Sequence, residues 1–159
     1  MGPLIGVIGG SSPTAQEESL AEAVGRSLGE EGAVLVCGGR GGVMEAACRG
    51  AKEVGGLTIG VLPGTDRDAA NPYVDIAIVT GMGQARNAII ARTVEAVIAI
   101  GGSYGTLSEI AFALAFDTPV VGLRTWVMER EGHPPVPVTR AETPDEATRL
   151  VLGLTRRRP

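Results

Sequence analysis

The sequence predicts an α/β fold in which a doubly wound, mostly parallel sheet of about six to seven strands carries helices on both faces. Short apolar runs alternate with longer segments whose apolar residues recur at helical spacing. The short runs are apolar throughout, which is typical of strands buried on both faces. Most of them end in glycine, and 24 of the 159 residues are glycine. No linker or repeat interrupts this pattern, so we expect residues 1–159 to form one domain.

Residues 4–8 are the first expected strand, and a long helix follows. Two signals compete for the start of this helix. Ser12 before Pro13 is typical of an N-cap followed by proline in the first turn. Thr14 with Glu17 offers a capping box instead.

The later elements repeat the order of strand, turn and helix. Further strands are expected at 33–37, 57–62, 74–80, 97–100 and 119–123, with a short edge strand at 136–139. Helices are expected at about 13–31, 43–54, 84–95 and 144–154, and another is expected to follow the 101–106 turn and to end at about 116. The last helix has the clearest start, because Thr143 can cap it, a proline follows, and Asp145 and Glu146 are acidic residues in its first turn.

Five loops are expected at one edge of this sheet, where the carboxyl ends of the parallel strands meet. They are 9–12, 38–42, 63–66, 81–86 and 101–106. A helix that follows such a loop points free backbone N–H groups at this edge, and those groups bind anions. Three of the loops are rich in glycine, which lets the backbone approach a ligand closely. Together they predict a phosphate or nucleotide site.

The residues expected to contact the phosphorylated ligand come from these loops and from the helix that follows the fourth. They are Gly9, Gly10, Ser11, Ser12, Gly38, Gly39, Arg40, Gly41, Gly42, Asn87, Gly102, Ser103, Tyr104, Gly105 and Thr106. None of the loops reads as G-x-x-x-x-G-K-[ST] or as a clean dinucleotide fingerprint. No acidic residue stands where it would grip the ribose of NAD. A P-loop NTPase and a nicotinamide enzyme are therefore both disfavoured.

Five polar side chains near these loops have two interpretations each. Arg86 can contact a phosphate or carboxylate, or lie on the surface. Asn87 can bind the ligand or cap a helix, and Arg40 can reach the ligand or remain at a loop tip. Glu109 can face the pocket as an acid or base, or complement the helix dipole in solvent. Tyr104 can stack on a ring or only cover the pocket.

The composition excludes several classes of function. The net charge of −4 argues against a nucleic-acid partner, and we interpret Arg156-Arg157-Arg158 as a frayed, solvated tail. No apolar run approaches the length of a membrane span, so we expect a cytoplasmic protein without a membrane partner. Cys37 and Cys48 are expected to be small buried core residues rather than a disulfide, and no histidine and cysteine cluster suggests a metal site.

The chain resembles the LOG (Lonely Guy) superfamily of Rossmann-like proteins, formerly labelled lysine-decarboxylase-like. The signature of that superfamily, P-G-G-x-G-T-x-x-E, aligns with Gly101 to Glu109, and its second-strand loop is similar to Gly38 to Met44. LOG enzymes are cytokinin riboside 5′-monophosphate phosphoribohydrolases. The resemblance implies that Arg86, in the place of an E-R-K run, and Glu109 are the catalytic residues.

The chain departs from the LOG signature at several positions. Gly101 replaces the proline, Ser103 the second glycine, and Ser108 the first glutamate of a T-x-E-E pair. The E-R-K run reads Ala85-Arg86-Asn87. These departures resemble a branch of small bacterial proteins that are also similar to the molybdenum cofactor carrier protein. A decarboxylase using pyridoxal phosphate is rejected, because it needs a Schiff-base lysine and the single lysine, Lys52, falls late in a helix.

Two functions remain open at this point. The first is hydrolysis of the N-glycosidic bond of a nucleoside 5′-monophosphate, with the glycine loops and Thr106 holding the phosphate. The second is a non-catalytic carrier of molybdenum cofactor or another phosphorylated small molecule. Neither requires a resident cofactor, although a nucleotide monophosphate or molybdopterin can be the bound ligand. The resemblance also implies a homo-oligomer, either a dimer or a tetramer.

Overall fold

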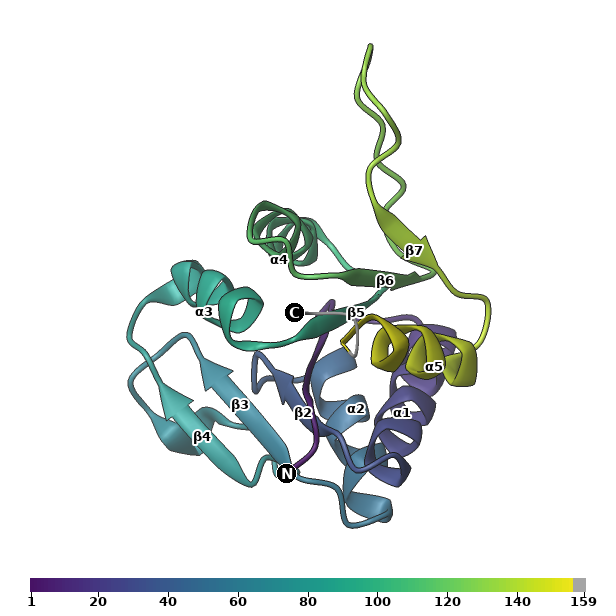
Figure 1. Cartoon of the computed structure of the whole chain (residues 1–159). Coiled ribbons are helices and arrows are strands. Elements are labelled where there is room, and N and C mark those ends of the chain that lie inside the picture. Colours follow the sequence, from purple (N-terminus) through teal and green to yellow (C-terminus); the bar gives the residue numbers. More distant parts are fainter. Residues whose placement is uncertain (156–159) are drawn as a thin grey trace.

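The computed structural model describes residues 1–155, and the arginine tail expected at 156–158 lies outside this range. Within it, seven strands form one sheet (Figure 1). They are β1 (Leu4–Gly9), β2 (Val34–Cys37), β3 (Thr58–Leu62), β4 (Ile76–Val79), β5 (Ala96–Ile100), β6 (Val120–Leu123) and β7 (Val138–Arg140). Every pair of neighbouring strands is parallel. The order β4-β3-β2-β1-β5-β6-β7 confirms the doubly wound α/β fold, with the reversal of strand order between β1 and β5.

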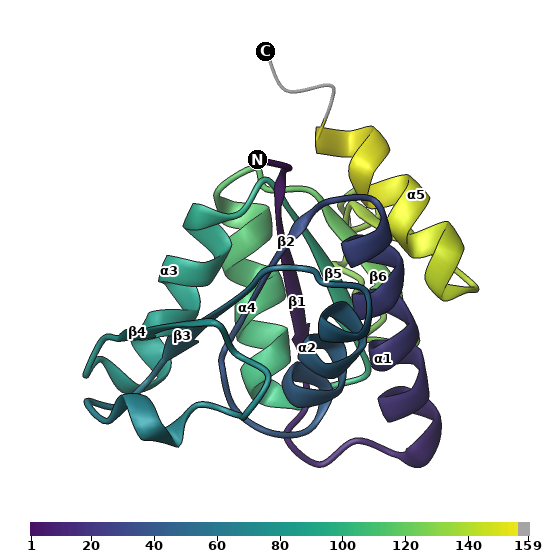
Figure 2. The same ribbon diagram turned by 90° about the horizontal axis from the view of Figure 1, so that it is seen from below.

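Five α-helices within the described residues cover the two faces of the sheet. They are α1 (Ala15–Glu30), α2 (Val43–Glu53), α3 (Arg86–Thr93), α4 (Tyr104–Ala115) and α5 (Pro144–Thr155). Helices α1, α2 and α5 lie on one face, and α3 and α4 lie on the other (Figures 1 and 2).

The central strand β5 shows why the strands are apolar throughout. All five of its residues are buried. Ile98 and Ile100 belong to the core under α1, α2 and α5, whereas Val97 and Ala99 belong to the core under α3 and α4. Alternate side chains of a strand point to opposite faces, so a strand covered on both faces has no position at which a polar side chain is solvated.

The first helix uses the capping box rather than the proline signal. The N-cap is Thr14, whose hydroxyl accepts from the Glu17 N–H at 3.2 Å, while the Glu17 carboxylate accepts from the Thr14 N–H at 3.1 Å. Ser12 lies in the exposed turn before it. The two cysteines are buried as expected, and their sulfur atoms, 3.6 Å apart, share a hydrogen bond and not a disulfide.

Several predicted elements are shorter in the structure, and three of them have a clear physical reason. Strand β4 covers 76–79 instead of 74–80 and leaves apolar side chains exposed, because it is the edge strand of the sheet. Helix α3 covers 86–93 instead of 84–95. A 3₁₀ turn (η2, Gly83–Ala85) precedes it, and Val94 already has an extended backbone leading into β5.

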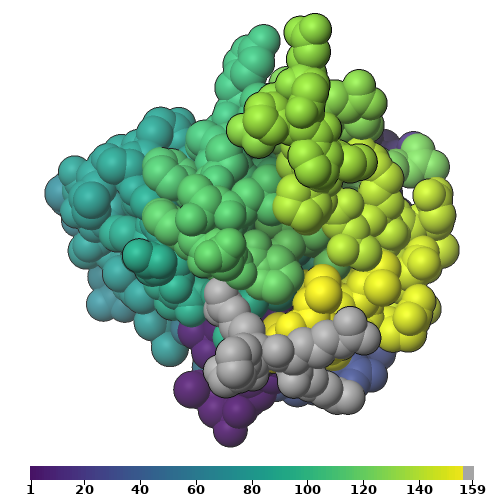
Figure 3. All heavy atoms as spheres, turned by 45° about the horizontal axis from the view of Figure 1, so that its top comes forward, coloured from purple at the N-terminus to yellow at the C-terminus, as the bar shows by residue number. Residues whose placement is uncertain are grey.

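The third shortened element is the last strand. It begins at Val138 instead of residue 136, because the Val138 N–H bonds the Val136 carbonyl in a tight turn before the ladder starts. The preceding segment, residues 124–137, projects away from the body of the molecule (Figures 1 and 3). A second 3₁₀ turn (η1, Arg67–Ala69) lies in the connection between β3 and β4.

Candidate functional site

A cavity of about 240 Å³ lies at the carboxyl edge of the sheet, over the strands on either side of the reversal point. The loops after β1, β2, β3, β4 and β5 and the first turns of α2, α3 and α4 contribute to its lining. The lining residues are Gly9, Gly10, Ser11, Arg40, Met44, Pro63, Gln84, Arg86, Asn87, Ser103, Gly105, Thr106 and Glu109. This is the edge at which the sequence predicted a phosphate site.

Ten of the residues predicted for the site line this cavity, and the others lie beside it in the same loops. Ser12, Gly38, Gly39, Gly41, Gly42, Gly102 and Tyr104 are outside the lining. Met44, Pro63 and Gln84 line it although they were not predicted as site residues. Pro63 and Gln84 belong to loops that were expected at this edge, but their side chains carry no charge that would have marked them.

Glycines of the second loop allow the first two loops to pack together. A Cβ atom on Gly42 would lie 2.3 Å from the Gly10 carbonyl oxygen, and Gly42 has a φ of +71°. The Val43 N–H, at the start of α2, donates to that same carbonyl at 3.0 Å. Glycine is therefore required at position 42 for loop packing. From the sequence alone, this role cannot be distinguished from ligand contact.

Gly38 makes room for the arginine of the site. A Cβ atom at this position would lie 2.7 Å from both Nη2 of Arg86 and Sδ of Met44. Gly102 plays the same part for Thr106, because a Cβ atom there would lie 2.4 Å from the Thr106 side chain. Residues outside the lining thus place the side chains inside it.

Helix α4 opens toward the cavity without a side-chain cap. Its N-cap residue is Ser103, whose side chain makes no capping hydrogen bond. The Leu107 N–H donates to the Ser103 carbonyl at 3.0 Å, which leaves the N–H groups of residues 104–106 without intrahelical acceptors. By contrast, α1 has its capping box. The free N–H groups and the helix dipole make the start of α4 suited to an anion.

Arg86 is the first residue of α3 and has only 8% of its surface exposed. Its Nη2 donates to the Gly38 carbonyl at 3.4 Å, and its Nη1 donates to Oδ1 of Asn87. Its Nε is buried and has no acceptor among the described residues. Burial lowers the pKa of Arg86, and the nearby Glu109 charge opposes that change. An arginine remains charged in proteins, so a buried positive charge lies at the cavity.

Glu109 lies one turn into α4 and has 7% of its surface exposed. Burial raises the pKa of Glu109 to about 7, although the positive charge of Arg86 acts in the opposite direction. Within the described residues its carboxylate makes no hydrogen bond or ion pair. A carboxylic acid with a pKa near neutrality is able to accept or donate a proton at physiological pH.

Asn87 connects the start of α3 to the start of α4. It is 1% exposed, and its amide donates to Oγ of Ser108 at 3.1 Å and to Oε1 of Gln84 at 3.3 Å. Ser108 in turn donates to the Gly105 carbonyl at 2.6 Å. Because its oxygen also accepts from Arg86, Asn87 orients that guanidinium. Asn87 does not cap α3, whose N-cap is Ala85. It lines the cavity, where ligand contact was predicted, and it also makes this connection.

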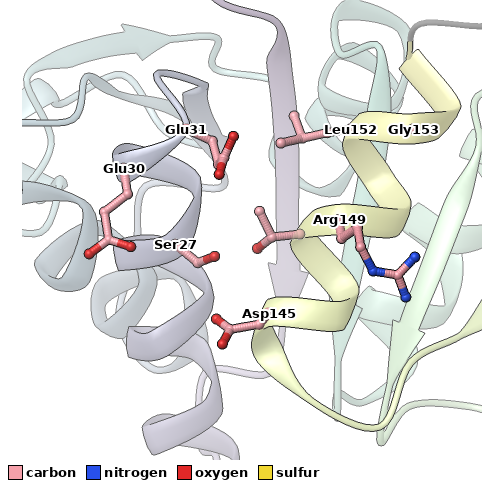
Figure 4. A pocket seen from close by; sticks show the side chains of 8 residues that line it. Ser27, Glu30, Glu31, Asp145, Arg149, Leu152 and Gly153 are labelled. Atoms are coloured by element: carbon pink, nitrogen blue, oxygen red, sulfur yellow. The ribbon is translucent and has the colours of Figure 1, made fainter.

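A second hollow, of about 630 Å³, lies between α1 and α5 (Figure 4). Its lining includes the carboxylates of Glu30, Glu31 and Asp145, while Arg149 points away from α1. Three carboxylates repel a phosphate, so this hollow does not suit the predicted ligand. Among residues 1–155, no cluster of three or more His, Cys, Asp and Glu side chains is placed to hold a metal ion. No helix in the same range is long and apolar enough to cross a membrane.

The fold and the site define a Rossmann-like α/β protein whose candidate ligand site lies at the carboxyl edge of a parallel sheet. The chain belongs to the SLOG cluster4 family, whose family model matches residues 3–148. The resemblance inferred from the glycine loops and from Glu109 is thereby confirmed at the level of the superfamily.

Among the similar proteins that are at least 30% identical, the stated functions fall into two groups. The molybdenum cofactor binding protein from Rippkaea orientalis is 38% identical, with a TM-score of 0.87, and the match covers 97% of this chain and 98% of that one. The molybdenum cofactor carrier protein from Chlamydomonas reinhardtii is 35% identical, with a TM-score of 0.83, covering 99% and 100%. The cytokinin riboside 5′-monophosphate phosphoribohydrolase of Mycobacterium tuberculosis is 32% identical over 136 residues, covering 74% of this chain and 73% of that protein.

Proposed function

We propose that this protein binds a phosphorylated small molecule, with the phosphate at the uncapped start of α4. The observation that carries this proposal is the meeting of three features at one cavity. The uncapped start of α4 contributes Ser103, Gly105 and Thr106 to its lining, the buried Arg86 supplies a positive charge, and Thr106 supplies a hydroxyl. Both groups of similar proteins are named for ligands that carry phosphate, which supports the proposal.

Within this proposal, the first candidate reaction is hydrolysis of the N-glycosidic bond of a nucleoside 5′-monophosphate. Water would add to C1′ of the ribose, the bond from C1′ to the base would break, and the base would leave with a proton. The products are the free base and ribose 5-phosphate. Glu109, when ionised, would take a proton from the water or stabilise the positive charge that develops on the sugar. Arg86 would hold the ribose phosphate and balance the charge of Glu109.

This candidate is tested by incubating the purified protein with AMP and measuring adenine and ribose 5-phosphate. The Glu109→Gln variant is expected to lose about 10²-fold or more of the activity, as is typical for a residue that transfers a proton. Glu30→Gln is the matched control, because Glu30 is an exposed glutamate in the hollow between α1 and α5. No release of base from AMP, GMP, CMP or UMP would contradict hydrolysis but not binding.

The second candidate is carriage of a phosphorylated pterin such as molybdenum cofactor, without chemistry. The specific support is the coverage of both molybdenum cofactor proteins, which match this chain over nearly its whole length and theirs. Native mass spectrometry of protein purified from its source tests this candidate. A co-purifying pterin that is released unchanged supports carriage, whereas a nucleotide monophosphate or ribose 5-phosphate supports the first candidate.

We also propose that copies of this chain associate as a dimer or tetramer. Large apolar side chains are exposed on and just after the edge strand β4: Ile76, Ile78, Val79 and Met82. Covering them would remove apolar surface from water. Light scattering during size-exclusion chromatography tests this, with Ile78→Lys expected to shift the mass toward the monomer. An unchanged mass for Ile78→Lys would show that β4 is not the contact.

A further inference from the structure

An aromatic pair lies beside the cavity, in a chain that has only five aromatic residues. The ring centroids of Tyr104 and Trp126 are 5.8 Å apart, and the two planes are tilted by 33°. Tyr104 is 80% exposed and belongs to neither of the two apolar cores. Burial of an aromatic ring is strongly favourable, so this ring is available to a ligand rather than engaged in folding.

The pair is attached directly to the loop that lines the cavity. Tyr104 stands between Ser103 and Gly105, which both line it. Trp126 belongs to the 124–137 segment, which projects from the body of the molecule (Figure 1). Its Nε1 donates to the Ser103 carbonyl at 3.1 Å. Two segments that are distant in sequence therefore place aromatic rings at the same rim, next to the proposed phosphate position.

The size of the cavity indicates that a ligand extends beyond it. Pockets that enclose a small molecule measure about 300–1,000 Å³, and this cavity measures about 240 Å³. A phosphate and part of a sugar fit such a space, whereas the ring of a nucleotide or pterin lies further out. The rim that carries Tyr104 adjoins the α4 start that would hold the phosphate.

We propose that Tyr104 and Trp126 form a stacking platform for the planar ring of the phosphorylated ligand. This inference rests on the proposed binding function and adds to it the part of the site that recognises the ring. Any planar base can stack on an aromatic side chain. The platform therefore favours ligands that carry a planar ring but does not distinguish one type of ring from another. The Trp126 hydrogen bond couples the platform to the loop at Ser103.

The test compares the affinities of three probes by calorimetry: AMP, neopterin monophosphate and ribose 5-phosphate, which has no ring. Tyr104→Ala is expected to weaken AMP or the pterin about tenfold and to leave ribose 5-phosphate unchanged. Trp126→Phe, which keeps a ring but loses the hydrogen bond, is expected to retain the affinity for the ring-bearing probe within about threefold. Phe112→Ala is the matched control, since Phe112 is a partly exposed aromatic residue eight positions further along α4.

A second readout uses Trp126 directly, because it is the single tryptophan of the chain. The ring-bearing probe is expected to quench its fluorescence at saturation, and ribose 5-phosphate is not. If AMP shows the larger gain in affinity over ribose 5-phosphate, the preferred ring is a purine. If neopterin monophosphate shows the larger gain, the preferred ring is a pterin.

The inference is overturned if ribose 5-phosphate binds as tightly as both ring-bearing probes. It is also overturned if Tyr104→Ala weakens all three equally, because the ring would then only support the loop. The proposed phosphate site survives both of these results. If none of the three probes binds, both the phosphate site and the platform are contradicted.

Discussion

Asn87 and Ser108 are joined by a 3.1 Å hydrogen bond between the starts of α3 and α4. These are two of the positions at which the chain departs from the LOG signature, where the E-R-K run has lysine and the T-x-E-E pair has glutamate. The two departures lie in contact, so a neutral amide and a hydroxyl that bond each other stand here in place of the lysine and the glutamate of the signature. The bond keeps Asn87 in place to orient Arg86.

This relationship predicts a coupling that unfolding in urea measures. Asn87→Ala removes a buried amide that bonds Arg86, Gln84 and Ser108, and we expect a loss of about 2–3 kcal/mol in the free energy of unfolding. Ser108→Ala is expected to cost about 1 kcal/mol. The double variant should lose less than the two single losses combined, because both singles break the same bond. Strict additivity would show that the hydrogen bond contributes nothing to stability.

The buried carboxyl of Glu109 predicts a pH-dependent cost in stability. Its pKa rises from 4.5 to about 7 on folding, so the folded protein binds the proton more tightly than the unfolded chain does. The free energy of unfolding therefore falls as the pH rises from about 4.5 to 7, by about 3 kcal/mol at most for this group. Glu109→Gln removes the ionisation and should be more stable than the parent at pH 8. At pH 4 the two should be similar.

Comparing the variant with the parent at each pH cancels the titration of the other groups. Thermal unfolding at pH 4, 6 and 8 measures the difference. A Glu109→Gln variant that is less stable than its parent at pH 8 would show that the ionised carboxylate is stabilised by a contact formed in solution.

The arrangement of loops at one sheet edge could be predicted from the sequence because it depends on local signals. Continuous apolar runs marked the strands, and glycines marked their carboxyl ends. The limits of β4 and α3 could not be predicted in the same way. Whether Ile76 is buried depends on which strand lies at the edge, and Val94 is apolar because it packs on the sheet, not because it is helical.

The candidate site, too, could be predicted where local signals marked it and not where it depends on contacts between distant segments. Arg86 and Glu109 were predicted, and the structure brings both to one cavity. The structural roles of Gly38 and Gly42 could not be predicted from the sequence, because they depend on contacts with Arg86 and Gly10 from other loops. Trp126 was not among the predicted site residues, because its contact with Tyr104 joins two segments that are separated in sequence by the rest of α4 and by β6.

Arg86 should be required for binding as a planar, forked donor and not only as a positive charge. Arg86→Lys keeps the charge but loses the fixed geometry of the guanidinium. We expect the affinity for ribose 5-phosphate to fall about tenfold or more in this variant. Arg92→Lys is the matched control on the same helix, since Arg92 is exposed and lies over the Phe116 ring at 4.3 Å. Equal affinities of the two variants for ribose 5-phosphate would show that the guanidinium of Arg86 does not bind the phosphate.

Gly102 should be required to hold the start of α4 in its anion-binding shape. Its φ of +103° is costly for any residue with a Cβ atom, and an added methyl group would lie 2.4 Å from the Thr106 side chain. Gly102→Ala is therefore expected to lower the free energy of unfolding by about 2 kcal/mol or more and to weaken ribose 5-phosphate binding. The control is Gly153→Ala, because Gly153 lies in α5 with open space around its Cα atom. Alanine at position 153 should increase the free energy of unfolding by about 0.5–1 kcal/mol without changing the affinity for ribose 5-phosphate. Urea unfolding and calorimetry measure both quantities, and a Gly102→Ala variant as stable as its parent would mean that the loop can relax away from Thr106.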